Sequence, residues 1–125
     1  MSRNLLAVLF FGLILSACST GKKAYERGDY YNATLQAVNR LRSNPDSKKA
    51  ISAVKDSYPM ALEYYQGKID YALSTNTEYK YSEIVDHYEK MNHLADEIRK
   101  CPAALKIFPN AKYFTSELLQ AREQA

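Results

Sequence analysis

The residues best suited to chemistry in this chain are its two cysteines and two histidines. Cys18 follows an apolar segment and two small residues, and its thiolate form is the nucleophile of cysteine chemistry. Cys101 has no Cys or His partner in the pattern around it. A lone thiol in an oxidising compartment can form an intermolecular disulfide, but a free cysteine is more often a small buried hydrophobic residue. Two cysteines exclude a disulfide scaffold and a cysteine-rich zinc site.

A second candidate is an acidic set that includes one histidine. Glu89, His93 and Glu97 are four residues apart and share one helix face, with Asp86 nearby, whereas His87 lies off that face. A metal site needs three or more convergent ligands, and one helix face comfortably supplies two. We therefore interpret this set as a solvated helix face and expect no metal and no other cofactor.

The composition narrows the function classes. The 125 residues correspond to one domain, and 17 Lys and Arg against 14 Asp and Glu give a net charge of +3. This charge is too small for a dedicated nucleic-acid binder. The chain has no nucleophile elbow, no Gly-rich phosphate loop and no dinucleotide fingerprint. We therefore expect neither nucleic-acid binding nor an enzyme.

The first residues are typical of a secretory signal. Arg3 precedes an apolar run from Leu5 to Leu15, and small residues follow it. A membrane-spanning helix needs about 20 residues, so this run is too short to remain as a transmembrane anchor.

The end of that segment, Leu15-Ser16-Ala17-Cys18, resembles the lipobox of bacterial lipoproteins. The resemblance implies that residues 1–17 are removed and that Cys18 carries a diacylglycerol and an N-acyl chain such as palmitate. Two or more chains anchor a protein stably. Ser19 in place of Asp is compatible with the outer membrane, and the absence of acidic residues directly after Cys18 favours its periplasmic side over the cell surface. An ordinary secreted protein with a chance cysteine is the alternative.

A short tether then leads into the folded body. Residues 18–21 form the lipidated cysteine and tether, and residues 22–125 form a helical domain held close to the bilayer. Lys22, Lys23 and Arg27 would face lipid headgroups there, or would simply lie in solvent at the start of a helix.

Periods of three and four residues predict an all-α fold of about five helices in a short stack of antiparallel pairs. Tyr81, Ile84, Tyr88 and Met91 belong to the clearest apolar stripe. Helices are expected at about 29–44, 47–58, 59–74 and 78–100, and from about 114 onward. Pro59 is expected to begin the third of these, because proline suits a first helical position.

One segment resembles the second helix of a tetratricopeptide repeat. Its matching residues are a Gly-Asp-Tyr turn, a small residue three positions later, a large apolar residue and a closing proline: Gly28, Asp29, Tyr30, Ala33, Leu41 and Pro45. Arg40 departs from the family's small residue, and the register is lost after Pro59. Together with the lipobox, the segment is similar to small envelope lipoproteins of Bacteroidota.

The chain has eleven tyrosines and no tryptophan. Most tyrosines at helical spacing are core residues, but neighbouring tyrosines point about 100° apart, so one of each pair should be more exposed. Tyr31, Tyr64 and Tyr71 are the candidates for a partner-binding surface, because tyrosine offers a large contact area and a polar tip.

The sequence therefore predicts an outer-membrane lipoprotein that faces the periplasm and acts as an adaptor or assembly accessory for another envelope protein. A lipoprotein that binds glycan or peptidoglycan fragments is the alternative. A small envelope enzyme is a third possibility, which would need a cleft near His87, His93 or Cys101.

Overall fold

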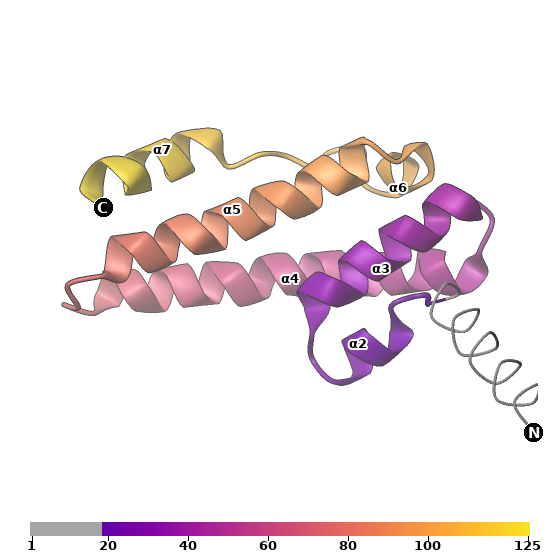
Figure 1. The fold of residues 1–125 in the computed structure, drawn as a ribbon, viewed down its shortest axis with the longest axis horizontal. Coiled ribbons are helices and arrows are strands. Elements are labelled where there is room, and N and C mark those ends of the chain that lie inside the picture. The colour runs from indigo at the N-terminus through magenta and orange to yellow at the C-terminus, as the bar shows by residue number, and fades with distance from the viewer. Residues whose placement is uncertain (1–18) are drawn as a thin grey trace, which may run out of the picture.

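The computed structural model describes residues 19–125, and this part of the chain is all-α, as predicted, with no strand. In Figure 1 the longest helix, α4, runs through most of the length of the domain, and α5 lies along it. The helices are α2 (Lys22–Glu26), α3 (Tyr30–Ser43), α4 (Lys48–Ser74), α5 (Lys80–Arg99), α6 (Pro102–Ile107) and α7 (Thr115–Gln124).

α3 begins where the sequence signals predict. Gly28 has φ +79°, which permits the tight turn after α2. Asp29 then caps the helix, since its carboxylate accepts a hydrogen bond from the Asn32 backbone N–H at 3.3 Å. The helix ends at Ser43, just before Asn44-Pro45, because the residue preceding a proline avoids the helical conformation.

α4 is one helix of 27 residues, so the predicted boundary between two helices at Pro59 was wrong. Ser47 caps it by accepting a hydrogen bond from the Ala50 N–H at 3.3 Å. A proline inside a helix costs about 3 kcal/mol, because it removes one backbone hydrogen bond. Here Pro59 lies on the exposed side, while Tyr58 and Ala61 on either side of it are buried in the same cluster. Tertiary packing on both sides therefore keeps the helix continuous.

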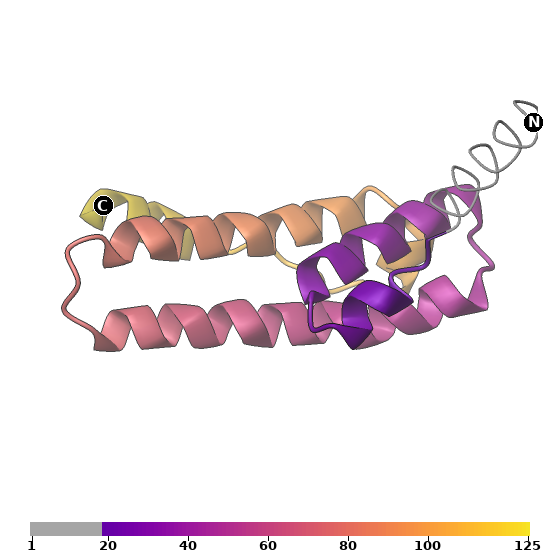
Figure 2. The ribbon, with the colours of Figure 1, turned by 60° about the horizontal axis from the view of Figure 1, so that its bottom comes forward.

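α5 runs antiparallel to α4 and agrees closely with the predicted helix over 78–100 (Figures 1 and 2). Thr75, at the end of α4, donates its hydroxyl proton to the Ala72 carbonyl at 2.9 Å and closes the last turn. The short α6 begins with Pro102 at its first turn and was not predicted. The chain then returns along α5 to α7, and Asn92 of α5 accepts a hydrogen bond from the Phe114 N–H at 2.6 Å at the start of α7.

Two apolar clusters make up the core. One joins α3, the first half of α4, the end of α5 and α6, and includes Leu41, Val54, Leu94 and Ile98. The other joins the second half of α4, the first half of α5 and α7. Tyr31 and Leu62 pack against both clusters and connect them. Figure 2 shows why two clusters form: α3 covers only the first half of α4.

One buried polar contact ties α3 to α4. Thr34 and Ser57 are both fully buried, and their hydroxyl groups form a hydrogen bond of 2.9 Å. Thr34 also donates to the Tyr30 carbonyl at 2.8 Å. Because a buried polar group without a partner is costly, this pair favours one alignment of the two helices.

Candidate functional site

The predicted anchor consists of Leu15, Ser16, Ala17 and Cys18. It lies outside the described residues. The chain that follows the anchor directly is packed against α3. The Ser19 hydroxyl donates to Oε1 of Gln36 at 2.8 Å, and Gly21 is buried with φ +90° against Ala33. Ser19 and Gly21, two residues of the predicted tether, therefore contact the folded body.

The three basic residues expected near a membrane are all exposed. Lys22 and Lys23 begin α2, and Arg27 follows its end. Only Arg27 has an acidic partner among them, with its guanidinium 3.7 Å from Asp29. The exposed pair of lysines on α2 is free to meet an anionic surface.

The residues of the repeat-like motif have clear structural roles. Gly28 forms the turn before α3, Asp29 caps that helix, and Ala33 and Leu41 are fully buried. Tyr30 is half-buried, and its ring packs on Tyr25 of α2 with centroids 5.4 Å apart. Pro45 is exposed after the end of α3.

Two of the three candidate tyrosines are exposed on one face of α4. Tyr64 is 50% exposed and Tyr71 is 70% exposed. With Lys68 they occupy positions i, i+4 and i+7 of the helix and so lie on one side of it. The Lys68 ammonium lies 5.5 Å from the centre of the Tyr64 ring. We call Tyr64, Lys68 and Tyr71 the α4 tyrosine strip.

The third candidate, Tyr31, is half-buried and lies at the edge of a surface hollow, so it is less exposed than Tyr64 and Tyr71. Its ring packs edge-on against Tyr65 and also contacts His93, with centroids 6.2 Å apart in both pairs. The Lys90 ammonium lies 4.6 Å from the centre of the same ring. Tyr31 therefore fills the junction between the two core clusters, where α3 begins and where α4 and α5 converge.

This junction is an aromatic cluster that the sequence analysis missed. Tyr65 contacts Tyr31, Tyr64 and the ring of His87, whose centroid lies 5.7 Å away. Burial, with smaller contributions from neighbouring groups, raises the pKa of Tyr65 to about 12. The rings belong to three different helices. The spacing of residues within one helix could therefore not predict that the rings meet.

The acidic face of α5 is used for helix-to-helix contacts. Glu89 pairs with Arg122 of α7 at 3.1 Å, and Glu97 pairs with Arg42 of α3. The Arg42 hydrogen bond holds the pKa of the Glu97 carboxyl below its usual value. Within residues 19–125, no group of three or more His, Cys, Asp and Glu side chains is placed to hold a metal ion.

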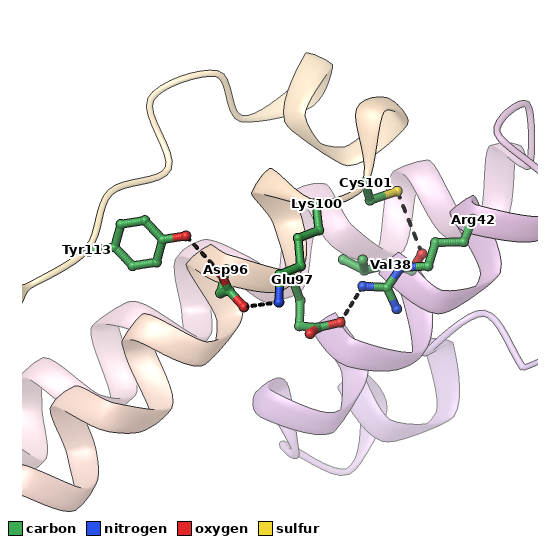
Figure 3. A network of polar contacts seen from close by, with 7 residues as sticks. All are labelled: Val38, Arg42, Asp96, Glu97, Lys100, Cys101 and Tyr113. Carbon is green, nitrogen blue, oxygen red and sulfur yellow. Dashed lines mark hydrogen bonds and ion pairs between the residues drawn. The ribbon is translucent and has the colours of Figure 1, made fainter.

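Figure 3 shows how these polar contacts gather at the end of α5. Asp96 accepts a hydrogen bond from the Tyr113 hydroxyl at 2.9 Å and pairs with Lys100 at 2.6 Å, which lowers the pKa of its carboxyl. Cys101 is 1% exposed, and its Sγ lies 3.9 Å from the carbonyl oxygen of Val38. The cysteine is thus a buried small residue in a network that joins α3, α5 and the C-terminal segment.

Two surface hollows adjoin Cys101 and His93. The larger, of about 890 Å³, lies between the end of α3, the start of α4 and α6, and Leu41, Ile51 and Cys101 are among the residues that line it. A smaller one of about 380 Å³ lies beside Tyr31, Lys90 and His93. Cys101 and His93 therefore lie at different places, and His87 lines neither hollow.

Residues 19–125 thus form an all-α domain with an exposed tyrosine strip and a packed N-terminal segment. No known protein family, characterised protein or solved structure matches the chain. Among the helices described, none has the length and apolar character needed to cross a bilayer.

Proposed function

We propose that this protein is an envelope lipoprotein whose helical domain holds another envelope protein. In this proposal residues 1–17 are removed, Cys18 is acylated, and the domain faces the periplasm from the outer membrane. The tetratricopeptide-like segment serves as part of a helical scaffold. The observation that carries the proposal is the α4 tyrosine strip, a row of exposed aromatic side chains on a long helix.

The strip has the properties of a protein contact surface. Tyrosine buries a large area and keeps a hydroxyl available for a hydrogen bond, and it is enriched among the residues that dominate binding energies. Tyr64 is also held in place, because its ring packs edge-on against Tyr65 at 5.2 Å and lies below Lys68. A side chain that is already ordered loses little conformational entropy when a partner binds.

The N-terminal segment supports the anchored arrangement. Ser19 and Gly21 are both fixed to α3, so a lipid on Cys18 would hold the folded body directly at the bilayer. The strip lies on the second half of α4, beyond the part that α3 covers (Figure 2). A partner could therefore reach it without displacing any helix of this chain.

Binding of glycan fragments is the second candidate. The hollow of about 380 Å³ beside Tyr31 places an aromatic ring next to the charged groups of Asp86, Glu89 and Lys90. Ring faces and charged hydrogen-bonding groups are what a sugar requires. However, Lys90 already covers the face of the Tyr31 ring, so a sugar would have to displace it.

The anchor is tested by labelling cells with radioactive palmitate. We expect the full chain to incorporate the label and to fractionate with the outer membrane, and we expect Cys18→Ser to lose both properties. Cys101→Ala is the matched control, because it removes the other, buried thiol and should keep the label. An unlabelled wild-type protein would refute the lipid anchor.

The partner surface is tested by affinity purification from detergent-solubilised envelopes. We expect the wild-type lipoprotein to recover a stoichiometric partner that the double variant Tyr64→Ala/Tyr71→Ala does not recover. Tyr113→Ala is the control, since it removes a tyrosine of 43% exposure that contacts Asp96 on α5 instead. Equal recovery by the wild type and the double variant would reject the strip, and so would the absence of any stoichiometric partner.

A further inference from the structure

Charge is distributed unevenly along the long axis of the domain. One half contains α2, α3, the start of α4, the end of α5 and α6, which are residues 19–58 and 94–114. It holds twelve Lys and Arg against six Asp and Glu. The other half, residues 59–93 and 115–125, holds four Lys and Arg against eight Asp and Glu. The two ends therefore carry net charges of +6 and −4, although the described chain as a whole is only +2.

Most of the excess positive charge is exposed and unpaired. Among residues 19–125, seven lysines of the positive half form no ion pair. These are Lys22, Lys23, Lys48, Lys49, Lys55, Lys106 and Lys112, and all seven are exposed. Lys48 and Lys49 lie in the first turn of α4, which contains no acidic residue. The partial positive charge of a helix N-terminus adds to theirs.

The larger hollow opens at this same end. Leu41, Ile51 and Ile107 contribute apolar surface to it, and Arg42, Lys55 and Lys106 line it as well. The positive end therefore combines ammonium groups with an apolar recess. This combination suits an amphiphile with an anionic head better than it suits a free anion in water.

The N-terminal segment leads toward the positive end. Gly21 lies beside Ala33, and Ser19 lies beside Gln36, one helical turn further along α3. Followed backward, the chain therefore runs toward the C-terminal end of α3, next to the start of α4 (Figures 1 and 2). Cys18 directly precedes Ser19, so a lipid on Cys18 would enter the bilayer beside the exposed lysines of the positive end.

We propose that the positive end of the domain docks on anionic phospholipid headgroups around the anchor, so that α4 stands away from the membrane. This inference rests on the proposed lipidation of Cys18. Exposed lysines gain electrostatic attraction at an anionic bilayer surface, within a Debye length of it. The negative end is repelled by the same surface. α4 is about 40 Å long at 1.5 Å per residue, so docking would carry Tyr71 away from the lipid and toward a partner.

Energy transfer to a lipid dye tests this orientation. The processed lipoprotein is reconstituted into vesicles with an acceptor dye at the headgroups, and a donor dye is attached at Asn44→Cys or at Thr77→Cys. Asn44 is exposed at the positive end, and Thr77 is exposed in the loop at the other end. Cys101 is buried and Cys18 carries lipid, so the donor labels only the introduced cysteine.

In vesicles with about one third phosphatidylglycerol, we expect much stronger transfer from position 44 than from position 77. The difference should shrink in pure phosphatidylcholine and in high salt, because salt screens exposed charges. Lys48→Glu/Lys49→Glu should shrink the difference in the same way. Lys68→Glu/Lys80→Glu is the control with the same change in net charge at the other end, and it should keep the difference.

The failures of the two proposals are distinguishable. A protein that does not sediment with phosphatidylcholine vesicles lacks the anchor, and this result overturns the docking as well. A protein that sediments but shows equal transfer from positions 44 and 77 in anionic vesicles is anchored without docking. That second result would overturn this inference alone. The positive end would then be assigned to the binding of an acidic protein.

Discussion

Gly21 lies directly against the backbone carbonyl of Ala33. A Cβ atom at position 21 would lie 2.3 Å from that oxygen, a distance that no real Cβ atom tolerates. Gly21, the last residue of the predicted tether, therefore makes a close contact between the N-terminal segment and α3. In the proposed lipoprotein, this contact would fix the point at which the domain leaves the membrane.

Replacement of Gly21 by alanine should destabilise the domain. The substitution adds the clash with Ala33 to the strain of φ +90°, and we expect a loss of at least about 2 kcal/mol in the free energy of unfolding. Chemical denaturation followed by circular dichroism measures this loss.

Two other glycines are matched controls for that experiment. Gly28→Ala has the strain of φ +79° but no clash, so it should cost only about 1 kcal/mol. Gly67→Ala lies inside α4 with open space around it, and it should stabilise the domain by about 1 kcal/mol, because alanine is the better helix former. A Gly21→Ala variant as stable as the wild type would show that the segment is not packed on α3.

The buried Thr34–Ser57 hydrogen bond should show strong coupling in a double-mutant cycle. Ser57→Ala leaves the Thr34 hydroxyl with one contact fewer, and we expect it to cost about 1–2 kcal/mol. Thr34→Val should cost a similar amount. The double variant should cost clearly less than the sum of the two, because it leaves neither hydroxyl unpaired. Additive losses would mean that the two hydroxyls do not interact across α3 and α4.

The stability of the domain should fall as the pH drops from about 7.5 to 5. Burial lowers the pKa of His87; Lys68 and Lys90 act in the same direction, while Glu83 and Asp86 oppose them. The unfolded chain, with an ordinary histidine pKa, therefore takes up a proton before the folded chain does. Protonation favours unfolding across this interval.

Urea denaturation at several pH values measures this effect. His87→Gln should flatten the decline, because it removes the titrating group that packs on Tyr65. His93→Gln, at the other histidine of the chain, is measured alongside it. A slope that survives in His87→Gln would assign the effect to another group.

Local signals predicted most of the helix starts. The Asp29 and Ser47 caps and the Gly28 turn act within a few residues of themselves, and the structure confirms them. The Pro59 boundary failed because burial of Tyr58 and Ala61 outweighs one missing backbone hydrogen bond. α6 has only six residues, which is too short to show an apolar period.

The candidate surface could be predicted only in part. The 100° angle between neighbouring residues correctly separated Tyr64, which is exposed, from Tyr65, which is buried. The same argument could not show how far Tyr31 is covered, because residues of α4 and α5 both contact its ring. A helix pattern shows which way a side chain points, but the contacts that cover it come from residues more than 30 positions away.

Site-specific photocrosslinking in living cells tests the central claim most directly. A photoreactive phenylalanine analogue is placed at position 71 of the α4 tyrosine strip, or at position 113 as the control outside it. The account predicts one discrete covalent adduct from position 71 that position 113 does not form. No adduct from position 71, or the same adducts from both positions, would contradict it.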